Sequence, residues 1–236
     1  MHSSNKYRIE VLKDLANKVD YKFKDQDLLN EALTHSSYAN ENKRINTKYN
    51  ERLEFLGDSV LSIVISDYLY NNLSTFQEGE LTKIRASIVC EPSLAKASMI
   101  MNAGEYLLLG KGEEVTGGRE RVSILADTFE AIIGAIYLDG GLKEASKFIL
   151  NRLETTVKDA IEGRIFQDYK THLQEIVQSK EGEKIEYEVI NEKGPDHNKV
   201  FYIQVKIGEN IVGQGSGKSK KEAEQKAAKE ALKKVI

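Results

Sequence analysis

The residues best suited to chemistry are acidic, and several of them stand in the segment 50–59, NERLEFLGDS. If this segment is a helix, which turns about 100° per residue, then Glu51, Glu54 and Asp58 fall within roughly 60° of one another. The opposite face carries apolar side chains that predict packing against a core: Leu53, Leu56, Val60, Ile63 and Val64. The acids therefore lie at the edge of a core, where the ordinary interpretation for one helix alone is a solvated acidic stripe.

A second acidic pair favours a different interpretation. Asp127 and Glu130 are spaced i, i+3 in the segment 124–137, whose other residues are nearly all apolar. No Lys or Arg occurs between Arg121 and Lys143 to neutralise them. Because carboxylates in apolar surroundings are costly unless they are paired or bound to a metal, the two helices together predict a carboxylate metal site.

The metal is expected to be a hard cation, because sites built from oxygen ligands select Mg²⁺ or Mn²⁺. Zinc is disfavoured, since His35, His172 and His197 do not cluster in the sequence and Cys90 has no CxxC partner. Many enzymes that hydrolyse phosphodiesters use one or two Mg²⁺ ions bound by carboxylates. The metals would also bridge an acidic pocket to a polyanionic substrate.

The elements that must position these acids are predicted to be helices over residues 1 to about 158, because apolar residues recur every three or four positions. The predicted helices are Arg8–Leu15, Gln26–Thr34, Arg52–Asn71, Glu80–Val89, Ser93–Ala103, Val122–Leu138 and Leu142–Asp159. The glycine-rich stretch Gly110–Gly118 is predicted to be a loop.

The pattern changes after residues 159–168, which are expected to form a linker. The elements predicted beyond it are a helix over Tyr169–Ser179, strands over Ile185–Asn191, Lys199–Ile207 and Glu209–Gly215, and a helix over Ser219–Val235. The expected fold is therefore an all-α domain over residues 1–158, followed by a small α+β domain of αβββα order over residues 169–236.

Charge separates between these two domains. The chain carries 34 Lys and Arg against 37 Asp and Glu, a net charge of −3. Residues 169–236 hold 13 basic and 11 acidic residues, a net of +2, which leaves −5 for the rest. Within Lys218–Lys234, seven lysines stand against three glutamates. The average charge argues against a uniformly basic nucleic-acid coat, but this local excess predicts phosphate contacts at the last helix.

The composition predicts a soluble intracellular protein. Cys90, the one cysteine, cannot form an internal disulfide, which is typical of a reducing cytosol. No stretch approaches the roughly 18 uncharged apolar residues of a membrane helix. We therefore expect a cytoplasmic location and no membrane partner.

One segment resembles a phosphate-binding loop without matching it. Residues 213–219, GQGSGKS, lie between a predicted strand and a predicted helix. The motif GxxxxGK[ST] requires glycine at position 212, which is Val212, and too few residues follow for a nucleotide-binding sheet. We expect no nucleotide cofactor.

Several segments together resemble a known family. NERLEFLGDS is similar to the signature sequence of ribonuclease III, and ILADTFEAIIGA resembles the second acidic motif of that family. Residues 33–37, LTHSS, are similar to its N-terminal Thr-His segment. The αβββα tail resembles the double-stranded RNA-binding domain that follows in bacterial members. The resemblance covers nearly the whole chain, from Tyr21 to Lys234.

The resemblance implies roles for the acids. It implies that Glu54, Asp127 and Glu130 are the principal Mg²⁺ ligands, with Mn²⁺ as a substitute. It also implies that Asp58 and Glu130 are the positions most closely tied to the chemical step. Two further acids correspond to positions near the scissile bond that help to place RNA or an additional cation: Glu51 and Glu78.

The resemblance also implies an assembly and a product. Members of the family work as homodimers in which each subunit cuts one strand, and Phe55 matches the aromatic knob that enters a socket on the partner. From the sequence alone, an ordinary core position is an equally good interpretation of Phe55. The expected products carry 5′-phosphate and 3′-hydroxyl ends with short 3′ overhangs, and precursors of ribosomal RNA are the usual substrates of bacterial relatives.

The tail offers three elements for binding double-stranded RNA, which proteins recognise by its backbone shape and 2′-hydroxyls. Gln174 and Glu175 on its first helix can hydrogen-bond to 2′-hydroxyls and base edges. The turn that contains His197 can enter the next minor groove. The last helix is expected to meet phosphates through lysines at its start: Lys218, Lys220 and Lys221. Later lysines are predicted to form a solvated face: Lys226, Lys229, Lys233 and Lys234.

We therefore expect a Mg²⁺-dependent endoribonuclease specific for double-stranded RNA. A non-catalytic binder of double-stranded RNA, whose acids merely hold a dimer, is one alternative. A helical metalloenzyme acting on small phosphate esters is another, but it leaves the tail unexplained. An intact acidic set favours cleavage over mere binding: Glu54, Asp58, Asp127 and Glu130.

Overall fold

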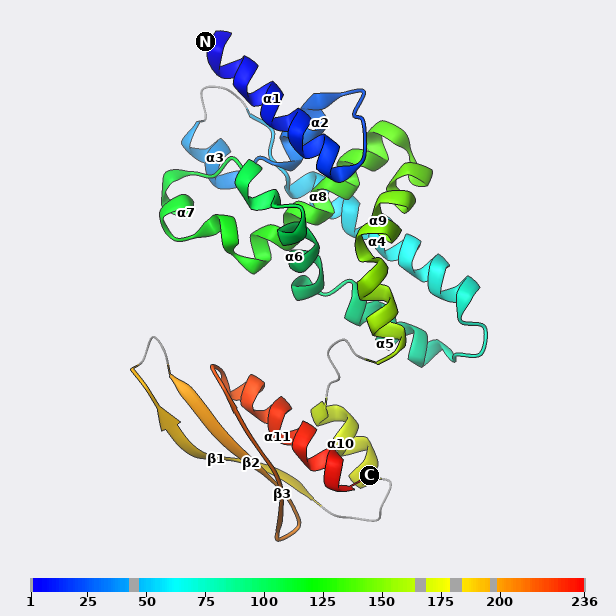
Figure 1. Ribbon diagram of the computed structural model, residues 1–236, viewed down its shortest axis with the longest axis vertical. Coiled ribbons are helices and arrows are strands. Elements are labelled where there is room, and N and C mark those ends of the chain that lie inside the picture. Colours follow the sequence, from blue (N-terminus) through cyan, green and yellow to red (C-terminus); the bar gives the residue numbers. More distant parts are fainter. Residues whose placement is uncertain (1, 43–46, 164–168, 179–183, 196–198, 236) are drawn as a thin grey trace. The chain divides into compact units, whose positions relative to one another are not determined.

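The chain forms two units in its computed structural model, Met1–Ile165 and Phe166–Ile236 (Figure 1). The structure describes residues 2–42, 47–163, 169–178, 184–195 and 199–235. Each unit has its own hydrophobic core.

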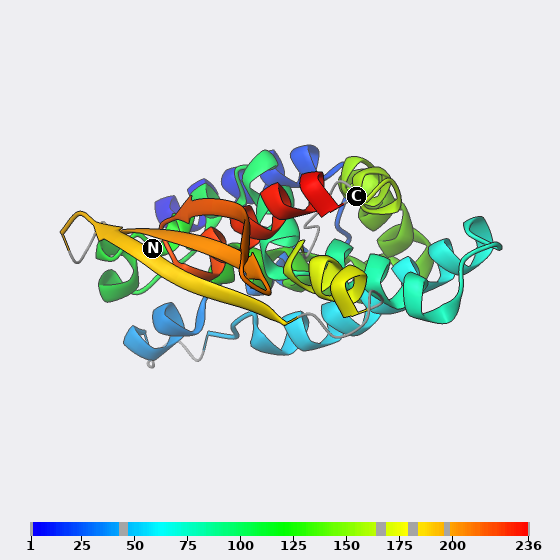
Figure 2. The same ribbon diagram turned by 90° about the horizontal axis from the view of Figure 1, so that it is seen from below.

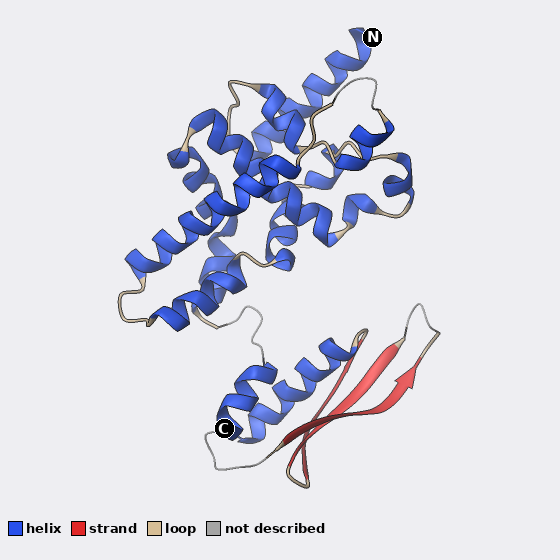
Figure 3. Ribbon diagram, turned by 180° about the vertical axis from the view of Figure 1, so that it is seen from behind, coloured by secondary structure: helices blue, strands red, loops and turns tan. Residues whose placement is uncertain are grey.

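The first unit is helical, and its described residues contribute no strand beyond a single bridge between Thr34 and Leu108 (Figure 3). Its helices are α1 (His2–Val19), α2 (Gln26–Ala32), α3 (Ser36–Glu41), α4 (Glu51–Asn72), α5 (Glu78–Ile88), α6 (Glu91–Ile100), α7 (Lys111–Val115), α8 (Val122–Gly140) and α9 (Leu142–Ile161). Two short 3₁₀ helices also occur in the described residues: η2 (Ala103–Tyr106) and η3 (Gly118–Glu120).

The seven predicted helices are all present, with shifts at their ends. The largest is at α1, which begins six residues before the predicted start at Arg8. Helix α9 runs to Ile161 and so includes the first residues of the expected linker, 159–168, of which 164–168 lie outside the described residues. No helix in the described ranges combines the length and the apolar character needed to cross a membrane.

The loop predicted over Gly110–Gly118 is wrong, because this stretch contains α7 and the start of η3. Both helices are too short to show an apolar period. Ion pairs stabilise them instead, with Arg119 bound to Glu114 at 2.5 Å and Arg121 bound to Glu113. Helix α3 was not predicted either, for the same reason of length.

Helix α8 forms the centre of the core, with α2, α4, α6 and α9 packed around it (Figure 1). Every residue from Ala131 to Ile136 is buried. Phe129, also buried, contacts Phe148 of α9 with 5.4 Å between the ring centroids. A helix that is apolar on all sides is typical of this central position.

Helices α4 and α8 cross at two glycines. A Cβ atom on Gly57 would lie 1.8 Å from the carbonyl oxygen of Glu130, and one on Gly134 would lie 2.3 Å from that of Leu53. The two backbones therefore touch, and no larger residue fits at either position without moving a helix. This close crossing brings Glu54, three residues before Gly57, next to Glu130.

The outer face of α4 carries large apolar side chains that its own chain does not cover. Phe55 is 78% exposed, Ile63 is 56% exposed and Tyr70 is 75% exposed. The prediction that Ile63 packs against the core is therefore wrong within one chain. Ile63 lies about 80° around the helix from the buried Leu53, which places it at the rim of the buried stripe.

The second unit is an antiparallel sheet with two helices on one face (Figures 1 and 2). Its elements are α10 (Tyr169–Gln178), β1 (Ile185–Lys193), β2 (Val200–Ile207), β3 (Asn210–Gly217) and α11 (Lys220–Val235). The strands lie in the order β1–β2–β3. Alternate residues of β2 are buried against α10 and α11, namely Ile203, Val205 and Ile207. The predicted αβββα order is confirmed.

Strand β3 and helix α11 pack closely because both present small residues. A Cβ atom on Gly213 would lie 2.2 Å from the carbonyl oxygen of Ala227, and one on Gly215 would lie 2.4 Å from that of Ala223. Both alanines are fully buried. The glycines that resemble a phosphate-binding loop thus serve the packing of a strand against a helix.

Candidate metal centre and nucleic-acid interface

Three carboxylates meet where α4 and α8 cross. Glu54 lies in the first turn of α4, and Asp127 and Glu130 lie one turn apart on α8. Each offers a carboxylate oxygen, and these oxygens all lie within 4.8 Å of one another. All three side chains are half-buried. The structure therefore brings together the three residues that the resemblance identifies as metal ligands.

The cluster holds more negative charge than its surroundings neutralise. Burial raises the pKa of Glu130 to about 8, and the charges of Asp58, Glu54 and Asp127 contribute to that rise. Burial also raises the pKa of Glu54, with contributions from Asp127, Glu51 and Asp58. Within the described ranges, no Lys or Arg forms an ion pair with any of the three clustered acids. A divalent cation would neutralise this charge, and carboxylate oxygens are the ligands that Mg²⁺ prefers.

Asp58 and Glu51 flank the cluster without belonging to it. Both are exposed on α4, and neither is among the acids whose oxygens lie within 4.8 Å. Their charges still act on the cluster, because Asp58 raises the pKa of Glu130 and Glu51 raises the pKa of Glu54. Their position suits contacts with the hydration shell of a cation or with a substrate.

The structure does not bring Glu78 to this cluster within one chain. Glu78 is the first residue of α5 and follows the C-terminal end of α4, whereas Glu54 lies near the N-terminal end of α4. The 22 residues of α4 span about 33 Å. The Glu78 carboxylate accepts a hydrogen bond from the Thr82 hydroxyl at 2.9 Å. Glu78 therefore does not belong to the acidic cluster of its own chain.

Two further ionisable neighbours of Asp127 come from other elements. Burial raises the pKa of Asp127, Glu91 at the start of α6 raises it further, and His35 lowers it. Spacing within the two acidic helices reveals neither neighbour. The Thr-His segment is the sequence signal that could have identified His35, whereas Glu91 has no such signal.

A short β-bridge fixes the start of α4. The Leu108 N–H donates to the Leu33 carbonyl at 2.8 Å, and the Asn50 N–H donates to the Thr34 carbonyl at 2.9 Å. Thr34 and Asn50 are both buried. The Nδ2 atom of Asn50 has no hydrogen-bond partner among the residues that the structure describes. The segment 33–35 thus supports the helix turn that carries Glu54.

In the second unit, the side chains of four of the predicted RNA-binding residues lie within the described part of the chain, and all four are exposed. Gln174 is exposed on α10, and the three lysines at the start of α11 are exposed as well: Lys218, Lys220 and Lys221. Lys220 Nζ lies 5.7 Å from the ring centre of Phe201, over its face. The side chain of Glu175 and the whole of His197 lie outside the described residues.

The later lysines of α11 behave differently. Lys226 Nζ lies 2.7 Å from Glu222 Oε1, and Lys233 Nζ lies 2.6 Å from Glu230 Oε1. Within the described ranges, the side chains of the three lysines at the helix start form no ion pair. Lys229 lies over the ring of Tyr169, and like Lys234 it has no ion pair in the described ranges. Three adjacent unpaired lysines nevertheless stand at the first turn and entrance of α11, where the helix dipole also favours a phosphate.

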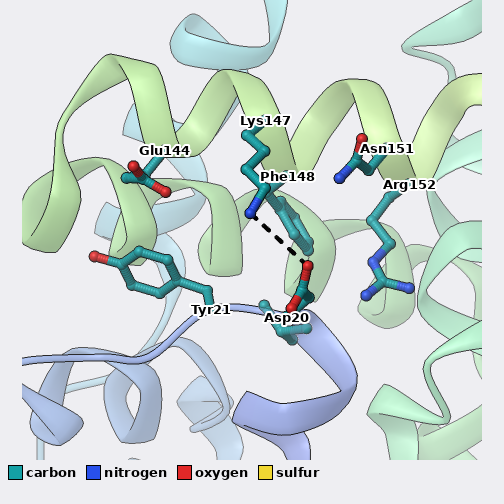
Figure 4. A pocket seen from close by; sticks show the side chains of 8 residues that line it. Asp20, Tyr21, Glu144, Lys147, Phe148, Asn151 and Arg152 are labelled. Carbon is teal, nitrogen blue, oxygen red and sulfur yellow. Dashed lines mark ion pairs between the residues drawn. The ribbon is translucent and has the colours of Figure 1, made fainter.

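A small pocket between the end of α1 and helix α9 is separate from the acidic cluster (Figure 4). Lys147 and Asp20 face each other across it at 3.9 Å. Arg152 donates a hydrogen bond to the Lys18 carbonyl. None of the predicted site residues lines this pocket, and these contacts attach α9 to the end of α1.

Comparison with known proteins identifies both units. The Ribonuclease-III-like family model matches residues 25–157, and the double-stranded RNA binding motif matches residues 169–235. A protein named Ribonuclease 3 from Caldanaerobacter subterraneus is 56% identical over 225 residues, which cover 95% of this chain and 98% of that protein. Ribonuclease 3 from Clostridium tetani is 54% identical over 228 residues, which cover 97% and 95%.

A solved structure agrees with these relatives. The nuclease domain of ribonuclease III from Campylobacter jejuni is 42% identical, has a TM-score of 0.57, and covers 61% of this chain and 96% of that chain. The resemblance seen in the sequence is confirmed, and so is the expected activity, an endoribonuclease specific for double-stranded RNA. The chain belongs to the ribonuclease III family.

Proposed function

We propose that the protein hydrolyses phosphodiester bonds of double-stranded RNA in a Mg²⁺-dependent reaction. The proposed products have 5′-phosphate and 3′-hydroxyl ends and short 3′ overhangs, and the proposed substrates include precursors of ribosomal RNA. The observation that carries the proposal is the cluster of Glu54, Asp127 and Glu130, whose unneutralised charge calls for a cation. We place the activity in the cytoplasm, which suits a chain with a single cysteine and an RNA substrate.

The acids in and beside the cluster have different proposed roles. Glu54, Asp127 and Glu130 would hold Mg²⁺, for which Mn²⁺ would substitute. When bound, the cation supplies activation of the attacking water and stabilisation of charge on the phosphoryl oxygens. Asp58, exposed beside Glu130, would take part in the chemical step by orienting that water. Glu51 would help to place the RNA strand or an additional cation.

We also propose that two copies of the chain form a homodimer through α4. The Campylobacter jejuni relative is described as having a region involved in dimer formation. Here Phe55 is exposed near the start of α4, and a groove between α4 and α9 lies toward the other end of α4, lined partly by Ile63, Tyr68 and Leu142. In a two-fold dimer with antiparallel α4 helices, Phe55 of each copy would fill the groove of the other.

This arrangement would also give Glu78 a place in the reaction. Glu78 follows α4, at the end opposite its own acidic cluster. Antiparallel α4 helices would bring it close to the cluster of the second copy. The site for each RNA strand would then be completed by both copies, with Glu78 positioning RNA or a cation.

The second unit would hold the duplex. Gln174 and Glu175 would contact 2′-hydroxyls in one minor groove, and the turn with His197 would reach the next. Exposed lysines at the start of α11 would meet the phosphates between them: Lys218, Lys220 and Lys221. The absence of ion pairs to these lysines within the described residues supports this assignment.

The experiment compares the parent protein with Glu130→Gln on a long RNA duplex in Mg²⁺, with sizing and end-mapping of the products. The parent should yield short duplexes with 5′-phosphate ends. Glu130→Gln should still shift the duplex in a gel but lose nearly all cleavage, because it removes a charged ligand. Glu154→Gln, an exposed acid on α9, is the matched control and should cleave normally. Full activity of Glu130→Gln would contradict the metal assignment.

A further inference from the structure

His35 is held firmly beside the acidic cluster. Its backbone N–H donates to the Leu108 carbonyl at 3.0 Å. The residue before it, Thr34, accepts a hydrogen bond from the backbone N–H of Asn50 at 2.9 Å. Because Asn50 directly precedes α4, the backbone of His35 is fixed relative to the helix turn that carries Glu54.

Ser37 determines which ring nitrogen of His35 carries the proton. The Ser37 N–H donates to Nδ1 at 3.2 Å, so Nδ1 must be an acceptor. The Ser37 hydroxyl accepts the Gly110 N–H at 2.9 Å and lies 2.8 Å from the same Nδ1, to which it donates its own proton. A neutral imidazole that accepts at Nδ1 carries its proton on Nε2. The ring therefore presents an N–H group on the side away from Ser37.

This Nε2–H group has no hydrogen-bond partner in the part of the chain that the structure describes, and the side chain is only half-buried. His35 and Asp127 lie close enough together to interact electrostatically. An oriented donor thus stands next to a cluster of acceptors without being bonded to them. The group that such a donor suits is an anionic oxygen that arrives with the substrate.

We propose that His35 binds the RNA strand in the acidic site by donating a hydrogen bond from Nε2 to a phosphate oxygen beside the scissile bond. The inference deepens the proposed function and rests on the acidic site described above. A phosphate that enters this site meets carboxylates that repel it. A fixed neutral donor offsets part of that repulsion without competing for the cation, and the contacts of Ser37 orient the ring before RNA arrives.

A purely structural role for His35 would be to cap α3, since its ring accepts the Ser37 N–H at the start of that helix. Two variants of the full-length protein separate this role from RNA binding. His35→Asn keeps an acceptor for the Ser37 N–H, because asparagine is a good N-cap residue, but it has no group at the place of Nε2. His35→Gln offers an amide N–H near the place of Nε2, but it has no acceptor near the place of Nδ1 for the Ser37 N–H.

Both variants are measured for melting temperature and for single-turnover cleavage of an RNA duplex at saturating Mg²⁺. We expect His35→Asn to melt like the parent and to cleave about 10- to 100-fold more slowly, the range for loss of one hydrogen bond to a charged group. His35→Gln should recover most of the cleavage rate although its melting temperature falls. The Mg²⁺ concentration for half-maximal cleavage should not change in either variant, because His35 holds no cation.

Two outcomes would overturn the assignment of His35. One is cleavage by His35→Asn at the parent rate, and the other is an equal loss of cleavage in both variants. Failure of the acidic site itself would be distinguishable, because it would appear as cleavage by Glu130→Gln at the parent rate, a measurement that does not involve the His35 variants.

Discussion

Substitution of Gly57 by alanine tests whether the close crossing of α4 and α8 builds the acidic cluster. The new Cβ atom would lie 1.8 Å from the Glu130 carbonyl oxygen and 2.5 Å from its carbonyl carbon, whereas ordinary contact begins at 3.4 Å. Because the obstacle is backbone, it cannot rotate away, and the helices must separate locally by about 1.5 Å. Overpacking of this kind costs about 1–3 kcal/mol, and the better helix propensity of alanine returns up to about 1 kcal/mol.

The consequence for the site is larger than the consequence for stability. Glu54 lies on α4 and Glu130 lies on α8. Moving the two helices apart would therefore lengthen the distances between carboxylate oxygens that now lie within 4.8 Å of one another. Mg²⁺ demands ligand distances near 2.0–2.1 Å, and a misplacement of about 1 Å in a reacting site can cost about 100-fold in rate. We therefore expect Gly57→Ala to cleave RNA about 100-fold more slowly and to melt roughly 2–8 °C lower.

The assay pairs single-turnover cleavage of an RNA duplex with thermal unfolding followed by far-UV circular dichroism. Gly79→Ala is the matched control, because Gly79 lies in α5 and a Cβ atom there would meet nothing within 4 Å. The control should cleave normally and melt at the same temperature or slightly higher. If Gly57→Ala behaved like this control in both measurements, the close crossing would not be what positions the cluster.

Three other predictions concern charge, RNA binding and assembly. Without metal, the pKa of Glu130 stands at about 8 against an ordinary value of 4.5, so the folded state holds the proton more tightly and the free energy of unfolding should fall as the pH rises from about 5 to about 8. Mg²⁺ binds the deprotonated form, so it should raise the melting temperature more at pH 8 than at pH 6; equal shifts at both pH values, measured against EDTA, would contradict the raised pKa. Changing Lys218, Lys220 and Lys221 together to alanine should weaken duplex binding and reduce its logarithmic salt slope by about 3, while the paired lysines changed in Lys226→Ala/Lys233→Ala should matter less. An unchanged slope in filter-binding titrations would remove the three lysines from the interface. Phe55→Ala should shift the protein from dimer toward monomer in analytical ultracentrifugation, whereas Tyr7→Ala, an equally exposed aromatic on α1, should not; a stable dimer in Phe55→Ala would refute the proposed knob.

The sequence predicts well what depends on long periodic patterns. The apolar faces of α4 and α8 continue for several turns, so both helices and the acids on them can be read from spacing. The first two strands of the second unit show an equally clear alternation of apolar and polar residues. Short helices are harder to predict because they contain no repeating pattern of apolar residues, and for this reason α3 and α7 were missed. Both are short, and they depend on side-chain contacts such as the His35 cap and the ion pairs of Arg119 and Arg121.

The acidic site was predicted only in part, for a physical reason. Glu54, Asp127 and Glu130 stand on two helices whose faces are visible in the sequence. Their closeness, however, depends on Gly57 and Gly134, and the role of a glycine in a helix crossing is not visible from one helix alone. His35 comes from a segment that reaches the site through the bridge between Thr34 and Leu108, a tertiary contact. Ile63 was misplaced because a rim position on a helix is buried or exposed according to what lies beside it.

The contact between β3 and α11 restricts how the second unit can change in evolution. In most cores a larger residue on one side can be compensated by a smaller one opposite. Here the nearest atoms that a side chain at Gly213 or Gly215 would meet belong to the helix backbone, which no substitution can shrink. A larger residue at either position cannot be compensated by a second substitution in α11. We therefore expect both glycines to be retained while other residues of the unit change. The string of glycines before Lys218 is therefore a requirement of space, and it imitates a nucleotide-binding motif in a chain that belongs to a family of RNA-cutting enzymes.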